Sequence, residues 1–233
     1  MAMHLPHVTV VLAMSADGKI ADYGRSPARF GSSADQAHLE AQIAQADAML
    51  FGAGTLRAYG TTLRIRNPEL VQQREHQGRP PQPVHIVCSA SGTLDPTLPF
   101  FSQPVPRWLL TSPAGAEQWQ ERKEFERIVC GAERGNRPFD MRYALEQLAS
   151  LGIQTIVLAG GGALVSAVLD EGLVHDLWLT VCPLLLGGST SPSPVDGEGW
   201  LAAHAPQLEL LSVKAIAHEV FLHYRLVDSG GGT

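Results

Sequence analysis

Thr155-Ile156-Val157-Leu158-Ala159-Gly160-Gly161-Gly162-Ala163-Leu164 is the stretch of this 233-residue chain that most constrains its fold. The first four residues are apolar and mostly β-branched, which predicts a buried strand, and the residues after the glycines favour a helix. Strand, glycine turn and helix in this order are typical of α/β proteins with a parallel sheet. Glycine amides can approach a ligand closely, and a helix start carries partial positive charge, so this turn predicts a diphosphate site.

A second turn of the same kind lies nearer the amino terminus. The short apolar strand Ala48-Met49-Leu50-Phe51 ends at Gly52-Ala53-Gly54-Thr55, where the Thr55 hydroxyl could donate to a phosphate. Because the carboxyl ends of parallel strands meet at one edge of a sheet, both turns could face one crevice. Neither turn reads GxGxxG or ends in GK[ST], which argues against an ordinary Rossmann domain or P-loop. An alternative remains open, in which the glycines only let a helix pack tightly on a strand.

The rest of the chain predicts alternating strands and helices. Further strands are expected at 8–14, 84–88, 108–111 and 127–130, and later ones at 177–181, 208–213 and 220–225, the last two as a hairpin. Helices are expected after a cap at Ser32 or Ser33, from Ser112-Pro113 through Lys123, and over Asp140–Leu151 with Tyr143, Ala144, Leu148 and Leu151 on one side. The polar, proline-bearing residues 61–83 predict a long surface loop.

These elements predict an α/β fold of three layers, a mainly parallel mixed sheet with helices on both faces and a C-terminal antiparallel hairpin. One domain is expected over residues 1–228, with a disordered tail at 229–233. The net charge is −6 and the 17 Lys and Arg residues are scattered, so nucleic acid is not an expected partner. With no secretory signal and no apolar run of membrane-spanning length, we expect a cytoplasmic protein. Cys88, Cys130 and Cys182 are expected to be buried, reduced thiols.

Motifs for metal or hydrolytic chemistry are missing from the sequence. His38-Leu39-Glu40 imitates the HxE of a zinc deaminase, but no PCxxC accompanies it, so both side chains are expected to be exposed on a helix. The other histidines and cysteines have no metal-ligand spacing, and there is no GxSxG.

Several segments, taken in order, resemble one known family. They are Met14-Ser15-Ala16-Asp17-Gly18-Lys19-Ile20-Ala21, the turn at Gly52, the three glycines at Gly160, and the two stretches Gly172-Leu173-Val174-His175-Asp176-Leu177 and Pro183-Leu184-Leu185-Leu186-Gly187-Gly188. The chain resembles the riboflavin-biosynthesis pyrimidine reductases, the C-terminal reductase domain of bifunctional deaminase-reductases. The deaminase part has no counterpart here.

The resemblance implies a fold like dihydrofolate reductase, a homodimer, and NADPH as the hydride donor that reduces a phosphoribosylamino-pyrimidine to its ribitylamino form. It implies that Ala13 meets the nicotinamide carboxamide and that Asp17 and Lys19 are catalytic. The residues that it places around the diphosphate are Gly52, Gly54, Thr55, Gly160, Gly161, Gly162, Ala163 and Leu164. Ser89 and Thr111 are placed beside the adenosine. The residues placed at the substrate are Ser15, Asp17, Lys19, Leu186 and Gly187. Asp17 and Lys19 could instead form only a solvated Asp-Gly turn.

Departures from the family pattern keep other functions open. Val11, Tyr59 and Ala159 stand where the bacterial pattern has lysine, aspartate and glutamate around the substrate. A reductase of another small carbonyl or imine compound, or a non-catalytic NADP-binding sensor, is therefore an alternative. The deaminated and diamino pyrimidines are not distinguished. The reader of the adenosine 2′-phosphate could be Arg57, Ser89, Ser91 or Arg107, and the proton donor is open, with water a candidate.

Overall fold

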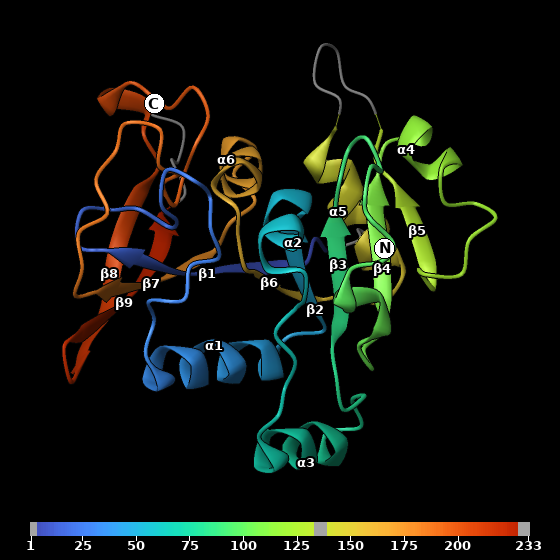
Figure 1. Cartoon of the computed structure of the whole chain (residues 1–233), viewed down its shortest axis with the longest axis horizontal. Helices are drawn as coiled ribbons and strands as arrows, with labels where there is room; N and C mark the ends of the chain where they lie inside the picture. Colours follow the sequence, from blue (N-terminus) through green and yellow to red (C-terminus); the bar gives the residue numbers. More distant parts are fainter. Residues whose placement is uncertain (1–3, 133–138, 228–233) are drawn as a thin grey trace. The chain divides into compact units, whose positions relative to one another are not determined.

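The computed structural model describes residues 4–132 and 139–227 (Figure 1). Within these residues, nine strands are hydrogen-bonded in the order β5-β4-β3-β2-β6-β1-β7-β9-β8. They form a mainly parallel mixed sheet that ends in an antiparallel hairpin, so the predicted α/β fold is confirmed. The chain divides into two compact units, which are described separately: residues 1–7 with 39–157, and residues 8–38 with 158–233. A single domain over 1–228 stays a prediction, and the expected tail at 229–233 lies outside the described residues.

The first unit is built on four parallel strands. These are β2 (Ala48–Gly52), β3 (Val84–Cys88), β4 (Arg107–Thr111) and β5 (Arg127–Cys130), each paired with the next. The unit also holds the start of β6 (Thr155–Leu158), with α2 (Ala53–Tyr59), α3 (Pro68–His76), α4 (Pro113–Glu117), α5 (Met141–Ser150) and a 3-10 turn at Pro99–Ser102. Buried apolar side chains such as Ile86, Leu109 and Phe100 form its core, as short β-branched strands between helices predict.

The second unit contains the antiparallel end of the sheet. Here β1 (His7–Ser15) pairs in parallel with β7 (Asp176–Cys182), β7 pairs with β9 (Glu219–Val227), and β9 pairs with β8 (Gln207–Ile216). Figure 1 shows β7, β9 and β8 running side by side. The unit also contains α6 (Gly162–Asp170) and a 3-10 turn at Ala202–His204. Helix α1 (Ser33–Gln45) begins in this unit and ends in the first.

The prediction of a loop over residues 61–83 is wrong, because α3 interrupts it. Asn67 caps the helix by accepting a hydrogen bond from the Glu69 amide at 2.9 Å, and Pro68 follows as its first residue. Arg74 of this helix is only 2% exposed and donates to the carbonyls of Ala44 (2.8 Å) and Ala46 (2.7 Å). The polar composition therefore concealed a helix whose cation binds the chain just before β2.

Two other helices depart from the predicted pattern. Ser112 caps α4 and Pro113 opens it as expected, but the helix ends at Glu117 rather than at Lys123. The Trp119 indole, just beyond this end, donates to the Gly92 carbonyl at 2.6 Å and packs into the core instead of extending the helix.

The buried face of α5 differs from the predicted one by one position. Tyr143 is 40% exposed and Leu151 is 36% exposed, whereas Met141 and Leu145 are buried with the predicted Ala144 and Leu148. The spacing of the apolar residues is compatible with two overlapping faces of the helix, and the face that packs against the core is not the predicted one.

Four side chains expected at the surface or in the core are placed differently. His38 is half-buried, with its ring edge-on to Trp178 at 4.6 Å between centroids, so its expected exposure is wrong. Glu40 is also only partly exposed, and its carboxylate accepts hydrogen bonds from the amides of Arg66 and Asn67. The three cysteines are free, but only Cys182 is buried and Cys130 is exposed at the end of β5.

Candidate active site

The residues after β1 form a tight turn. The Ser15 amide donates to the Lys19 carbonyl at 2.8 Å, and the Gly18 amide donates to the Ser15 carbonyl at 2.9 Å. Gly18 has a φ of +77°, which explains why an Asp-Gly pair stands here. The Lys19 amide donates to the Ser15 hydroxyl at 2.9 Å. This turn fixes the backbone positions of Asp17 and Lys19.

Asp17 joins this turn to the segment that follows β7. Its carboxylate accepts hydrogen bonds from the amides of Leu186 (3.0 Å) and Gly187 (2.6 Å) and from the Ser15 hydroxyl (2.6 Å). These hydrogen bonds, led by the one from Ser15, lower the pKa of Asp17 to about 2. The structure thus brings together Ser15, Asp17, Leu186 and Gly187, which lie far apart in the sequence. An ionised carboxylate with these donors is an anchor and not a proton donor at neutral pH.

Lys19 adds a positive charge to the same cluster. Its ammonium donates to the Ser191 carbonyl at 3.4 Å, and within the described residues no carboxylate lies in ion-pair range of it. The ammonium therefore keeps donors for a further anionic group. The Ser191 hydroxyl is buried beside it without a hydrogen-bond partner in the described part of the chain.

Ala13 occupies β1 two residues before this turn. It lies opposite Thr180 of β7 in the parallel register, and Val11 lies opposite Trp178. Val11 is 5% exposed and part of the apolar core, so it offers no polar group where the bacterial pattern has lysine.

The turn between β6 and α6 leaves the first amides of the helix without a side-chain cap and also makes a tight packing contact. Gly161 caps the helix with no side-chain hydrogen bond, and Gly160 has a φ of +106°. A β-carbon on Gly162 would overlap the Ser193 carbonyl and lie 2.7 Å from an Asp196 carboxylate oxygen. Gly162 is therefore required for packing, and the tight-packing explanation holds at this one position. Asp196 is engaged by the Ser193 amide and hydroxyl, each at 3.0 Å.

In the first unit, Gly52 and Gly54 form the corresponding turn. Gly52 caps α2, again without a side-chain hydrogen bond, and Thr55 lies in the first turn of the helix. A β-carbon on Gly54 would meet nothing within 4 Å. Packing does not explain this glycine, in contrast to Gly162.

Ser89 follows β3, and Thr111 is the last residue of the neighbouring strand β4. Ser89 is 6% exposed and Thr111 is fully buried, with the Thr111 hydroxyl donating to the Ala90 carbonyl at 3.3 Å. The two residues therefore offer almost no surface to a ligand. Arg107 begins β4, at the opposite end of that strand from Thr111, and its guanidinium donates to the carbonyls of Glu124 and Val105, so it is excluded as a reader of a phosphate at the carboxyl ends of these strands.

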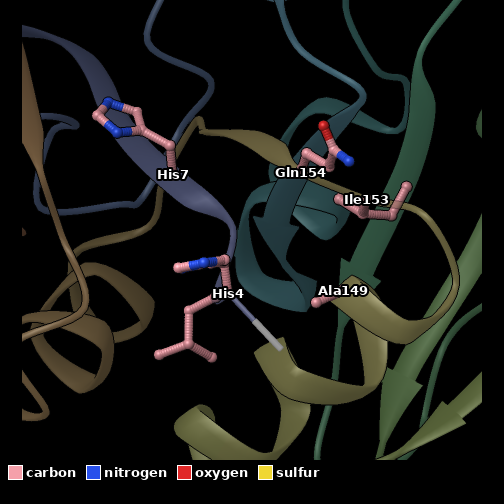
Figure 2. A pocket seen from close by; sticks show the side chains of 6 residues that line it. His4, His7, Ala149, Ile153 and Gln154 are labelled. Carbon is pink, nitrogen blue, oxygen red and sulfur yellow. The ribbon is translucent and has the colours of Figure 1, made fainter. Parts of the chain in front are cut away.

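A shallow pocket of about 470 Å³ lies elsewhere in the first unit (Figure 2). Its lining residues are His4, Leu5, His7, Ala149, Ile153 and Gln154. The His7 amide donates to the Gln154 carbonyl at 2.8 Å, just before β6 begins. The pocket thus lies at the amino end of this strand, whereas Gly52, Ser89 and Thr111 lie at carboxyl ends, so it is separate from the candidate residues.

Sequence reasoning missed a buried polar cluster in the second unit. Glu219 is 4% exposed and accepts hydrogen bonds from the Ser32 amide (2.7 Å) and hydroxyl (2.5 Å). Asp35 lies beside it on α1, where burial raises the pKa of its carboxyl against a hydrogen bond from Thr180. Burial and the neighbouring Glu219 and Asp35 raise the pKa of Cys182 to about 12. The alternation of β9 marks Glu219 as inward-facing, and this was the available signal.

Residues 6–222 match the sequence model described as the RibD C-terminal domain. The chain belongs to this family. The resemblance found in the sequence is therefore confirmed, over nearly the whole length of the chain. Within the described residues no group of histidine, cysteine and acidic side chains is arranged to hold a metal ion, and no helix is long and apolar enough to cross a membrane.

Members of the RibD C-terminal domain family are similar to the chain in sequence. The 2,5-diamino-6-ribosylamino-4(3H)-pyrimidinone 5′-phosphate reductase of Archaeoglobus fulgidus is 28% identical, covering 84% of this chain and 89% of the relative. The riboflavin biosynthesis protein RibD of Actinobacillus pleuropneumoniae is also 28% identical over 96% of this chain, but the chain spans only 57% of that protein.

Solved structures show the same fold. A pyrimidine reductase-like protein of Corynebacterium diphtheriae superposes with a TM-score of 0.78 at 22% identity, covering 96% of this chain and 93% of the other. Dihydrofolate reductase of Enterococcus faecalis, which was solved with NADP(H), gives a TM-score of 0.50 at 11% identity, covering 95% and 97%. The predicted likeness to dihydrofolate reductase is confirmed at the level of the fold.

Proposed function

We propose that the chain is an NADPH-dependent reductase that transfers a hydride to the ribosyl carbon of a 5-phosphoribosylamino-pyrimidine and gives the ribitylamino product of riboflavin biosynthesis. The observation that carries this proposal is the family match over residues 6–222, together with relatives of similar length that are named as reductases of this substrate class. The cluster of Ser15, Asp17, Leu186 and Gly187 supports it, because the family's segments come together in space.

NADPH fits what the two glycine turns offer. Both α2 and α6 begin at a glycine with no side-chain cap, so their first amides can donate to a diphosphate. Open space at Gly54 allows a ligand to approach the backbone closely. In the first unit we assign the diphosphate to Gly52, Gly54 and Thr55, and the adenosine to the strand ends at Ser89 and Thr111. In the second unit we assign the diphosphate to Gly160, Gly161, Gly162, Ala163 and Leu164.

The reacting end belongs to the second unit. Ala13 offers its backbone to the nicotinamide carboxamide, and the cofactor supplies the hydride when bound. Lys19, whose ammonium has no carboxylate partner in the described part of the chain, attracts the sugar phosphate, since a half-buried ammonium is stabilised by an anion. Asp17 keeps the backbone of Leu186 and Gly187 in place against the substrate. Its role is orientation rather than proton transfer.

A second candidate is a reductase of another carbonyl or imine compound. The buried Val11 favours it, because an apolar core residue cannot replace the lysine of the bacterial pattern at the substrate. The cofactor residues are common to both candidates, so only substrate trials separate them.

We also propose that the protein is a homodimer. Strand β8 is the last strand of the sheet, and its large apolar residues are exposed by 43% at Leu208, 52% at Leu210 and 56% at Val213. Exposed apolar side chains on an edge strand are unfavourable in water, and pairing with the same strand of a second copy of the chain would bury them. A cytoplasmic location accords with three free cysteines, which is typical of a reducing compartment.

The experiment that tests the function follows NADPH oxidation by the purified protein. The deaminated phosphoribosylamino-pyrimidine and its diamino precursor are added in separate assays. Oxidation of one NADPH for each molecule of one of them converted would support the proposal and name the substrate. Binding of NADPH without oxidation by either compound would favour the second candidate or a sensor.

A further inference from the structure

Two aspartates of the second unit lie in opposite environments. Asp17 accepts three hydrogen bonds, which lower its pKa to about 2. Asp35 lies in the first turn of α1, where burial raises the pKa of its carboxyl, and the nearby Glu219 carboxylate acts in the same direction. Proteins separate an ionised anchor from a proton donor by giving carboxyl groups divergent pKa values.

The Asp35 carboxyl lies near strand β7. Thr180 of this strand is 2% exposed, and its hydroxyl is close enough to the Asp35 carboxyl to oppose the rise of its pKa. Thr180 is also the register partner of Ala13 in β1. The Asp35 carboxyl is therefore next to the strand pair whose backbone the proposed function assigns to the nicotinamide.

Glu219 holds Asp35 through a chain of hydrogen bonds. Its carboxylate binds both the amide and the hydroxyl of Ser32. The same hydroxyl accepts from the amides of Ala34 (3.0 Å) and Asp35 (3.4 Å), which caps α1. A β-carbon at Gly31 would overlap the Asp35 carboxylate, so the carboxyl also lies tightly against the backbone before the helix.

We propose that the Asp35 carboxyl, held over Thr180, donates the proton in this reductase, and that Glu219 is a positioning residue acting through Ser32. The proposal rests on the proposed function and answers a question that the sequence left open. The imine carbon of the opened sugar receives the hydride from the dihydronicotinamide, which is oxidised. The C=N electron pair moves onto nitrogen, which takes the proton of Asp35, and a proton from the bulk solvent then reprotonates the carboxylate, so that the reaction consumes one proton in all.

The protonation of Asp35 depends on the groups that surround its carboxyl. Glu219 faces it from β9, and Thr180 and Cys182 face it from β7. His38 lies one turn along α1, where burial, His223 and Lys214 lower its pKa. Within the described residues no side-chain cation is among the groups that act on Asp35, and burial and Glu219 raise the pKa of its carboxyl from the ordinary value.

The first test replaces Asp35→Asn and compares it with Asp22→Asn, whose carboxylate accepts a hydrogen bond from the Ser26 amide. We expect kcat to fall by about 100-fold or more for D35N, with the Kd for NADPH unchanged, because general acid catalysis contributes about 10²- to 10⁴-fold. D22N should keep the activity of the original protein. D35N with unaltered kcat would overturn the assignment.

A second readout does not depend on turnover. The infrared difference spectrum between the original protein and D35N should show a protonated carboxyl that persists above the ordinary pKa of aspartate, about 3.9. A band lost at that ordinary pKa would overturn the assignment, whatever the turnover. Absence of NADPH oxidation in the original protein would instead overturn the proposed function, so the two failures are distinct.

The positioning role has its own variants. S32A should lower kcat more than it changes KM, and S32T, which restores a hydroxyl, should recover most of kcat. G31A should lower kcat as well, because it displaces the carboxyl without removing it. Full activity of both S32A and G31A would contradict the role of Glu219 and Ser32.

Discussion

The Asp17 carboxylate accepts a hydrogen bond from the Gly187 amide at 2.6 Å, across 170 positions of the chain. We expect D17N to raise KM for the pyrimidine and lower kcat/KM by about tenfold or more, because an amide cannot accept from both backbone donors. The Kd for NADPH should not change. Steady-state kinetics and a fluorescence titration measure these quantities, with the exposed Asp95→Asn as control.

The pH profile tests the same carboxylate. A pKa lowered to about 2 means that the anchor is intact above the ordinary pKa and is lost only as the pH falls toward about 2. An activity loss between about pH 4 and 6 that disappears in D17N would contradict this, since it would place the titration of Asp17 in the ordinary range.

Substitutions at Gly54 and Gly162 distinguish a role in cofactor binding from a role in packing. G54A should leave the free energy of unfolding unchanged or slightly higher, since its β-carbon meets nothing, but weaken NADPH binding by about tenfold. G162A should lower the free energy of unfolding by about 1–3 kcal/mol, because its β-carbon overlaps Ser193 and Asp196. Urea unfolding and NADPH titration measure both, and unaltered NADPH binding in G54A would remove Gly54 from the proposed cofactor site.

His85 should make the first unit sensitive to acid. Burial lowers its pKa from 6.5 to about 3, and Arg107 and Arg74 act in the same direction. A depressed pKa means that its neutral form is native, so stability is full above about pH 6.5 and falls toward about pH 3, by up to about 1.4 kcal/mol per pH unit.

H85N keeps an acceptor for the Thr62 hydroxyl, which lies 2.9 Å from the ring, and should remove this slope. Urea unfolding at a series of pH values measures the effect, with the exposed His204→Asn as control. An equal slope in H85N and in the original protein would assign the acid sensitivity to other groups.

The exposed apolar residues of β8 predict the oligomeric state. The double change L208E/L210E should convert a dimer to a monomer in sedimentation velocity, with little loss of stability, because both side chains are exposed by 43% or more. The control is E209Q, at an exposed position between them whose carboxylate lies 3.7 Å from Arg225. A monomeric original protein, or a dimer that survives the double change, would remove this interface.

The local sequence pattern was sufficient to predict the strands and the first residues of most helices. Ser112-Pro113 and the alternation of β9 each carry their own signal, since capping and period-two burial are local effects. The helix around Arg74 was missed because its cation is buried by carbonyls at Ala44 and Ala46, some thirty positions away, and composition does not report such contacts.

The site shows the same division. The turn at Asp17 could be recognised from Ser15 to Lys19, but its hold on Leu186 and Gly187 depends on strand pairing between β1 and β7. Asp35 and Glu219 were missed because each is an ordinary polar residue until α1 covers β7 and β9. Their significance comes from burial, which arises only in the folded chain.

The most direct test of the central claim follows the hydride itself. NADPH carrying deuterium at the transferred position is incubated with the protein and the phosphoribosylamino-pyrimidine, and the product is analysed by mass spectrometry and NMR. The account predicts a ribitylamino product with one deuterium on the carbon that was bonded to the ring amine. A product without deuterium at that carbon, or no product in the presence of bound NADPH, would contradict it.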